Sequence, residues 1–192
     1  MKRRRLIAQL VRQRAYYRAE RDRLEAESEE LKRQKAESLL GLIGAIVISW
    51  AKLENLIDLS VGMIHHTWGR TAIQHDLPPS LDRELDYMKS ALRSWKFSTE
   101  SSEKLRGLLP RIHALKTFRH DFVHGLADIH EIEGLPLQIT TVKGAFHRHE
   151  AKHYSVVQIQ RKTEHLVKLV TDFTAFTEGI ASEFIERQDR NR

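Results

Sequence analysis

The pattern of apolar and polar positions changes several times along the chain, and each change predicts a new element. From about residue 4 to residue 37, isolated apolar residues recur every seven positions among mostly charged neighbours: Leu10, Tyr17, Leu24 and Leu31. One narrow stripe of this kind is typical of a long polar helix that docks on another helix or forms a weak coiled coil. It buries too little apolar surface to be stable alone.

The next segment, residues 39–66, is apolar over a wider surface. One stripe contains Leu39, Ile43, Ile46, Trp50, Leu53, Ile57, Val61 and Ile64, and a second contains Leu42, Ala45, Leu56, Leu59 and Met63. A helix that is apolar on two faces is predicted to lie in the middle of a bundle. Glu54 lies beside the first stripe, where a carboxylate requires a basic partner. The longest apolar run, about a dozen residues, is short for a bilayer span, so we expect no membrane association.

Two further helices are predicted before the middle of the chain. Ser80 can cap a helix that has Asp82 and Glu84 in its first turn and one apolar face. The serine- and threonine-rich segment 98–102 predicts another helix start. Pro110 should break or restart that helix, which leaves a piece over about 110–127.

The remaining residues predict a small β-hairpin and a last helix. Leu137 to Val142 and Tyr154 to Ile159 have strand-like patterns and are joined by the basic segment 143–153. An amphipathic pattern then predicts a helix over about 160–186. The expected fold is therefore an all-α helical bundle with a long N-terminal helix and a small β-hairpin inserted before the last helix.

Composition is that of an ordinary soluble protein, with 41% hydrophobic and 30% charged residues in 192. There is no cysteine, which excludes disulfides and thiolate chemistry and fits the reducing cytoplasm. No apolar block of the kind found in a signal peptide follows the basic residues at the N-terminus. We expect a cytoplasmic protein.

The net charge of +6 is concentrated at the N-terminus. Residues 1–35 contain 12 of the 32 Lys and Arg residues but only 6 of the 26 acidic residues, so the rest of the chain is neutral. We therefore divide the chain into a basic arm, residues 1–37, and a helical domain, residues 38–192. Arg3, Arg4 and Arg5 in the arm are candidates for binding RNA phosphates. A simply solvated, charged helix is the alternative.

The segment Arg119-His120-Asp121-Phe122-Val123-His124-Gly125 concentrates acid–base and anion-binding groups on a helix of the core. On an ideal helix the directions of Arg119 and His124 differ by about 140°. A long arginine reaching around the helix could contact the histidine, or two copies of the segment could face each other across a two-fold axis. Otherwise Arg119 forms a structural ion pair with Asp121 or Glu54 beside a packed histidine.

These residue types suit cleavage of RNA. Arginine offers fixed donors for the charge that builds on phosphorus, and histidine can take a proton from a ribose 2′-hydroxyl near neutral pH. No metal is needed because the nucleophile belongs to the RNA. We also expect Lys116, Lys143 and Arg148 to contact RNA.

Arg119 and His124, separated by four residues with a polar residue directly after the arginine, resemble the signature motif of HEPN domains. The setting is similar as well: a long apolar helix with an internal Glu54 precedes a later helix that carries the motif, and the resemblance covers about residues 38–186. It implies a homodimer with a composite site and metal-independent endoribonuclease activity, without a cofactor.

Matching the motif by position implies a role for each residue. His124 would be the general base, Arg119 the transition-state stabiliser, and His120 an orienting or assisting group, with Glu54 and Asp121 as supporting residues. Such domains often act as toxins paired with an antitoxin or in defence against phage. Others serve only as dimerisation or nucleic-acid-binding modules, and this non-catalytic function is the alternative.

Metal binding is a further possibility that the histidines raise. His120 and His124 are four residues apart on one helix face, a spacing that zinc sites use. A third ligand would have to come from His130, His147, His149 or His153. Loop histidines are usually solvated, so we expect no metal.

Overall fold

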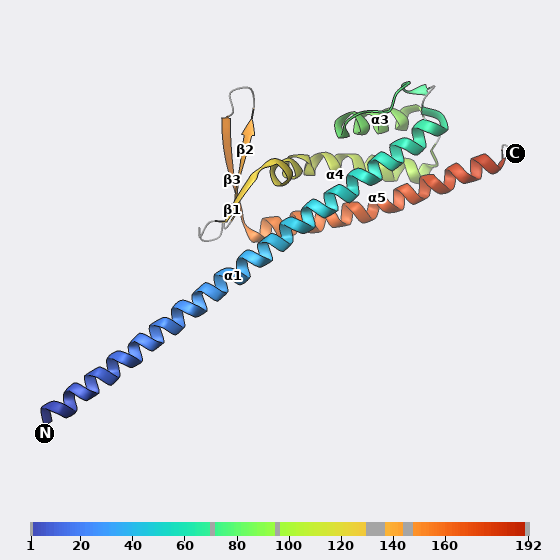
Figure 1. Ribbon diagram of the computed structural model, residues 1–192. Helices are drawn as coiled ribbons and strands as arrows, with labels where there is room; N and C mark the ends of the chain where they lie inside the picture. The colour runs from blue at the N-terminus through green and yellow to red at the C-terminus, as the bar shows by residue number, and fades with distance from the viewer. Residues whose placement is uncertain (1, 70–71, 95–96, 130–136, 144–147, 191–192) are drawn as a thin grey trace. The chain divides into compact units, whose positions relative to one another are not determined.

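The computed structural model describes residues 2–69, 72–94, 97–129, 137–143 and 148–190 (Figure 1). Contacts divide the chain into two compact units, Met1–Gly41 and Leu42–Arg192. The described residues form the α-helices α1, α3, α4 and α5, a π-helical turn at His65–Gly69 and the strands β1, β2 and β3. This confirms the predicted helical bundle with a long N-terminal helix and a small antiparallel hairpin before the last helix.

Helix α1 comprises Lys2–Ile64 and contains the predicted polar segment. Within the first unit, Tyr17, Leu24 and Leu31 are 62%, 55% and 52% exposed. Ion pairs one turn apart support the helix, for example between Arg23 and Glu20 at 2.6 Å. Such exposed pairs add only a few tenths of a kcal/mol each, about 0.3–0.5. This part of the helix therefore lacks a core of its own.

The part of α1 that belongs to the second unit is buried on one side only. Ile46, Trp50, Leu53, Ile57, Val61 and Ile64 are buried, whereas Val47, Ile48 and Leu59 are 41%, 71% and 54% exposed. The prediction that this helix lies in the middle of the bundle was wrong. Hydrogen bonds join it to α4 and α5, and these helices cover one face of it.

Among the described helices, the stretch Gln13–Thr67, formed by α1 and the π-helical turn after it, is long and apolar enough, by length and composition, to cross a membrane. Core helices of soluble proteins share this property.

Helices α3 (Leu81–Ser94) and α4 (Thr99–His124) begin at the predicted capping residues. The Ser98 side chain accepts a hydrogen bond from the Ser101 N–H at 3.1 Å. The predicted break at Pro110 is absent, and α4 continues through it. Pro110 lies on the exposed side of the helix, where water can hydrate the carbonyl that lacks a donor.

The sheet has three antiparallel strands in the order β1 (Leu126–Ile129), β2 (Leu137–Lys143) and β3 (Arg148–Tyr154). The hairpin of β2 and β3 was predicted, but β1 was not. The pairing Leu137↔Tyr154 shows that β3 ends where the predicted second strand was to begin.

Helix α5 comprises Val156–Arg190, so the predicted strand over Tyr154 to Ile159 is wrong. Ser155 and Gln158 form a reciprocal capping box. The Gln158 N–H donates to Ser155 Oγ at 3.1 Å, and the Ser155 N–H donates to Gln158 Oε1 at 2.9 Å. The β-branched residues that follow Ser155 favour a strand locally, but the cap starts a helix.

The core of the second unit lies between the buried face of α1, helix α4 and helix α5 (Figure 1). Ser60 of α1 and Thr177 of α5, both buried, are hydrogen-bonded at 3.0 Å. The buried apolar residues of α5 recur at helical spacing, as predicted: Leu166, Leu169, Val170, Phe173, Phe176 and Ile180.

Candidate active site

The site lies at the C-terminal end of α4, whose rotation is set by two aromatic residues. Phe118 and Phe122 are buried with ring centroids 4.4 Å apart. Because they hold one face of the helix in the core, His120 and His124 remain exposed, and Arg119 lies at the edge between the two environments. The apolar pattern of the sequence thus positions the polar motif.

Gly125 ends α4 and leads directly into β1. Its N–H donates to the Asp121 carbonyl at 2.9 Å. A Cβ at this position would lie 2.3 Å from that carbonyl oxygen and 2.3 Å from Ile139 Cγ2, well inside contact distance. Glycine is therefore required for the sheet to approach the end of the motif helix this closely.

Arg119 joins His124 to Glu54. Its Nη1 lies 3.0 Å from His124 Nε2, and its Nη2 donates to Glu54 Oε1 at 2.8 Å. Of the two arrangements considered for the motif, the structure contains the one in which a long arginine reaches around the helix. A guanidinium only donates, so His124 Nε2 must be the acceptor and its proton must lie on Nδ1. This neutral imidazole is the form that a general base requires.

The Arg119–Glu54 contact is also an ion pair, with side chains 24% and 32% exposed. The predicted basic partner of Glu54 is thereby confirmed, and Arg119 pairs with Glu54 rather than with Asp121. Partial burial makes this pair less screened than a surface pair. The second hydrogens of both Nη atoms have no partner in the described chain and can bind an anion.

Asp121 points away from the motif and anchors the sheet to α4. It is 1% exposed and accepts hydrogen bonds from Lys152 Nζ at 3.0 and 2.8 Å and from the Tyr154 hydroxyl at 2.6 Å. Burial, and secondly the hydrogen bond to Asp121, raise the pKa of Tyr154. Lys152 was predicted to lie in the segment that connects the two strands, but it lies in β3. Its ion pair with Asp121 holds β3 against α4 beside the site.

A buried carboxyl group beside the site was missed at the sequence level. Glu84 of α3 is 8% exposed. Burial, a hydrogen bond to Asp58 and the negative charges of Asp58 and Glu54 raise the pKa of Glu84 to about 8. Glu84 therefore keeps its proton at neutral pH and can donate it in the hydrogen bond to Asp58. Glu84 lies on the same helix face as Leu81, Leu85 and Met88. This position within an apolar stripe could have indicated from the sequence that its carboxyl group is buried.

Protonation of Glu84 predicts a pH-dependent stability. The unfolded chain releases this proton near its ordinary pKa of 4.5, whereas the folded protein holds it up to a pKa of about 8. The free energy of unfolding should therefore fall as the pH rises between these values, by about 2 kcal/mol or more. Glu84→Gln should flatten this dependence and stabilise the protein at pH 9 in urea unfolding. Glu103→Gln, an exposed change on α4, is the matched control, and parallel curves for the wild type and Glu84→Gln would contradict the assignment.

The predicted RNA-binding residues occupy different environments. Lys116 forms an ion pair with Asp82 of α3. Lys143 and Arg148 face each other at the end of the β2–β3 hairpin, and their side chains lie outside the described part of the structure. The side chains of residues 3–5 lie outside it as well.

The histidines are not gathered at a metal site within the described residues. The rings of His120 and His124 are 5.1 Å apart, but no group of three or more possible ligands is found among the residues that the structure describes. His153 Nε2 lies 3.1 Å from Gln138 Oε1. His130, His147 and the side chain of His149 lie outside the described residues.

No protein-family model matches the chain, and neither a curated protein nor a solved structure matches it significantly. The fold and site define a helical bundle with an Arg–His–Glu cluster at one helix end. The resemblance to HEPN domains rests on this cluster and its helical setting, and it stays a prediction.

Proposed function

We propose that this protein is a metal-independent endoribonuclease of the HEPN type. The observation that supports this best is the 3.0 Å contact between Arg119 Nη1 and His124 Nε2. A guanidinium, which can bind a phosphate, thus lies beside a histidine nitrogen that can act as a base. Both groups lie at the surface, within reach of an RNA strand.

In the proposed reaction, the phosphate of the bound RNA takes over the hydrogen bond that Arg119 Nη1 donates to His124 Nε2 in the free protein. The freed His124 Nε2 then takes the proton of a ribose 2′-hydroxyl, and the resulting oxygen attacks the adjacent phosphorus. The bond between phosphorus and the 5′-oxygen then breaks, which leaves a 2′,3′-cyclic phosphate and a 5′-hydroxyl. Arg119 stabilises the additional charge on the phosphate oxygens. His120, exposed with its ring 5.1 Å from that of His124, can supply the proton for the leaving 5′-oxygen.

Glu54 is proposed to orient Arg119. An arginine with several rotatable bonds loses considerable entropy when it is fixed in one conformation. The 2.8 Å bond to Glu54 fixes it before substrate binds, and a guanidinium can donate to a phosphate through its remaining hydrogens at the same time. The negative charge of Glu54 also partly cancels the positive charge of Arg119 in the free site. A phosphate must therefore fit closely against the guanidinium to be bound.

The exposed apolar side of α1 supports the proposed homodimer. Val47, Ile48 and Leu59 are exposed there, and Val47 is two helical turns from Glu54 on the same face. A second copy that covers this surface would lie beside the Arg119–Glu54 pair. Exposed apolar side chains that gather on one side of a helix can form such a contact with a second copy.

Ile48→Glu is therefore expected to weaken the homodimer at least tenfold, because the charge would be buried in the contact. Sedimentation equilibrium measures the change. Val167→Glu, which introduces the same charge at an exposed apolar position of α5, should leave the dimer intact. Equal dimer dissociation constants for Ile48→Glu and the wild type would place the dimer contact elsewhere.

The biological role that the resemblance suggests is that of a growth-arresting toxin with an antitoxin, or of a defence effector against phage. RNA would be the substrate in either case. The basic residues 3–5, together with Lys143 and Arg148, are proposed to hold its phosphates.

The test of the reaction is cleavage of labelled RNA by the purified protein in excess EDTA. The expected result is cleavage with cyclic-phosphate and 5′-hydroxyl ends. Cleavage that EDTA abolishes would refute the metal-independent mechanism and favour a metal ion bound by His120 and His124.

The second candidate is a non-catalytic nucleic-acid-binding module, and the ion pair between Arg119 and Glu54 favours it. That pair satisfies one charged donor with a protein carboxylate, as a structural arginine would. This function predicts that deletion of residues 1–35 abolishes RNA binding, whereas Arg119→Ala retains it. Filter binding on both variants separates the two functions.

A further inference from the structure

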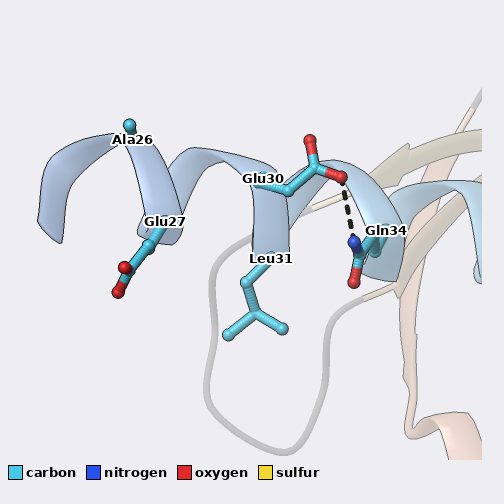
Figure 2. A pocket seen from close by; sticks show the side chains of 5 residues that line it. All are labelled: Ala26, Glu27, Glu30, Leu31 and Gln34. Atoms are coloured by element: carbon cyan, nitrogen blue, oxygen red, sulfur yellow. Dashed lines mark hydrogen bonds between the residues drawn. The ribbon is translucent and has the colours of Figure 1, made fainter. Parts of the chain in front are cut away.

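The arm, residues 1–37, lies in the first compact unit, Met1–Gly41, and carries an apolar stripe that nothing within that unit covers. Tyr17, Leu24 and Leu31 lie on one face of the helix at intervals of seven residues and are each more than half exposed. Figure 2 shows that the Leu31 side chain projects from the helix on the side opposite to Glu30, whose carboxylate bonds to Gln34 at 2.9 Å. The polar contacts of this helix thus leave the stripe free.

Charge is distributed along the same helix in two blocks. Residues 2–18 contain seven basic and no acidic side chains, whereas residues 20–30 contain six acidic and two basic side chains. Among the described residues, no carboxylate pairs with Arg14 or Arg18. These two arginines are one turn apart, so they repel each other within the helix. An acidic surface from outside would relieve this repulsion.

We propose that the arm pairs with the arm of a second copy of the chain as an antiparallel two-helix coil. This inference is independent of the proposed nuclease function. In the antiparallel orientation the three basic residues Arg12, Arg14 and Arg18 of each helix lie along the acidic block 20–30 of the other. A parallel pair would place basic against basic and acidic against acidic, which disfavours it.

The apolar stripe sets the register. Centring the pair between Glu20 and Arg21 places Tyr17 opposite Leu24 of the second copy and Leu10 opposite Leu31. In this register Arg14 and Arg18 lie on the same flank of the contact as Glu25 and Glu29 of the other helix, because equivalent flanks meet in an antiparallel pair. Apolar and charged contacts therefore agree on one alignment.

A second copy suits the arm better than RNA does. A phosphate backbone would be attracted by residues 2–18 but repelled by the acidic block 20–30, and it would not cover the apolar stripe. The paired segment extends from Leu10 to Leu31, so residues 3–5 lie outside it and stay available to RNA.

The chain has no cysteine, so introduced cysteines report the orientation directly. In the antiparallel register, the two copies of residue 10 are 21 residues apart along the axis, or about 32 Å, too far for a disulfide. Leu10→Cys and Leu31→Cys proteins should therefore each stay uncrosslinked under oxidation, while their mixture should form a disulfide-linked dimer. The mixture of Leu10→Cys with Arg33→Cys is the matched control, because residue 33 lies about 160° around the helix from Leu31, and it should give at least tenfold less crosslinked dimer.

A charge exchange gives an independent measurement. In an Ile48→Glu background, which removes association through the other surface, Arg18→Glu and Glu25→Arg should each weaken self-association at least threefold. The double variant should restore it. Crosslinking of Leu10→Cys or Leu31→Cys with itself would indicate a parallel coil and overturn the proposal. Absence of crosslinks in the mixture would overturn the proposal too. If added RNA then protects the arm from proteolysis, RNA and not a second copy is the partner of the arm.

Discussion

Replacing His124 or Arg119 by alanine should lower the rate of RNA cleavage by about 10³-fold, because each change removes one of the two groups that act on the transition state. The 3.0 Å contact makes the two residues a unit, so the double variant should lose little more than either single variant. Arg119→Lys should not rescue activity, since an ammonium cannot hold His124 and Glu54 in the planar geometry of a guanidinium. Single-turnover rates on labelled RNA measure all four variants.

The matched control is His113→Ala, which removes an exposed histidine from the same helix without touching the motif. It should cleave RNA at the wild-type rate. Circular dichroism should show the same helical content for each variant. Wild-type rates for both Arg119→Ala and His124→Ala would refute the proposed function while leaving the pairing of the arms untouched.

Gly125→Ala is expected to reduce the free energy of unfolding by about 3 kcal/mol, the upper part of the range for overpacked sites. The added Cβ would lie 2.3 Å from the Asp121 carbonyl oxygen, and backbone cannot rotate away as a side chain can. The sheet would have to separate from the end of α4, which carries His124. Cleavage activity should therefore fall together with stability in urea unfolding.

Gly107→Ala is the control for this prediction. Gly107 lies on the same helix, and nothing is within 4 Å of the position its Cβ would occupy. Alanine there should stabilise the protein by about 0.5–1 kcal/mol, since it lowers the entropy of the unfolded chain. A Gly125→Ala protein that is as stable as the wild type would show that β1 approaches α4 less closely than the structure indicates.

Periodicity and capping residues in the sequence were sufficient to predict most of the helices and the core face of α1. Ser98 marked the start of α4, and the apolar residues of α5 were found at their helical spacing. The errors at Pro110 and Ser155 were local. Pro110 was predicted to break α4, but the helix tolerates proline at this exposed position. The capping box at Ser155 was overlooked because two β-branched valines follow it and favour a strand.

The sequence by itself determined that an arginine, two histidines and an acid lie at the end of a core helix, and that Glu54 needs a basic partner. Only the tertiary structure decided that this partner is Arg119, that Asp121 turns inward to Lys152, and that Glu84 is buried beside Asp58 with a raised pKa. Local patterns report which face of a helix is apolar, because that depends on spacing along one chain segment. Pairing between residues 26 to 65 positions apart depends on how the helices and the sheet pack, and spacing along the chain does not contain that information.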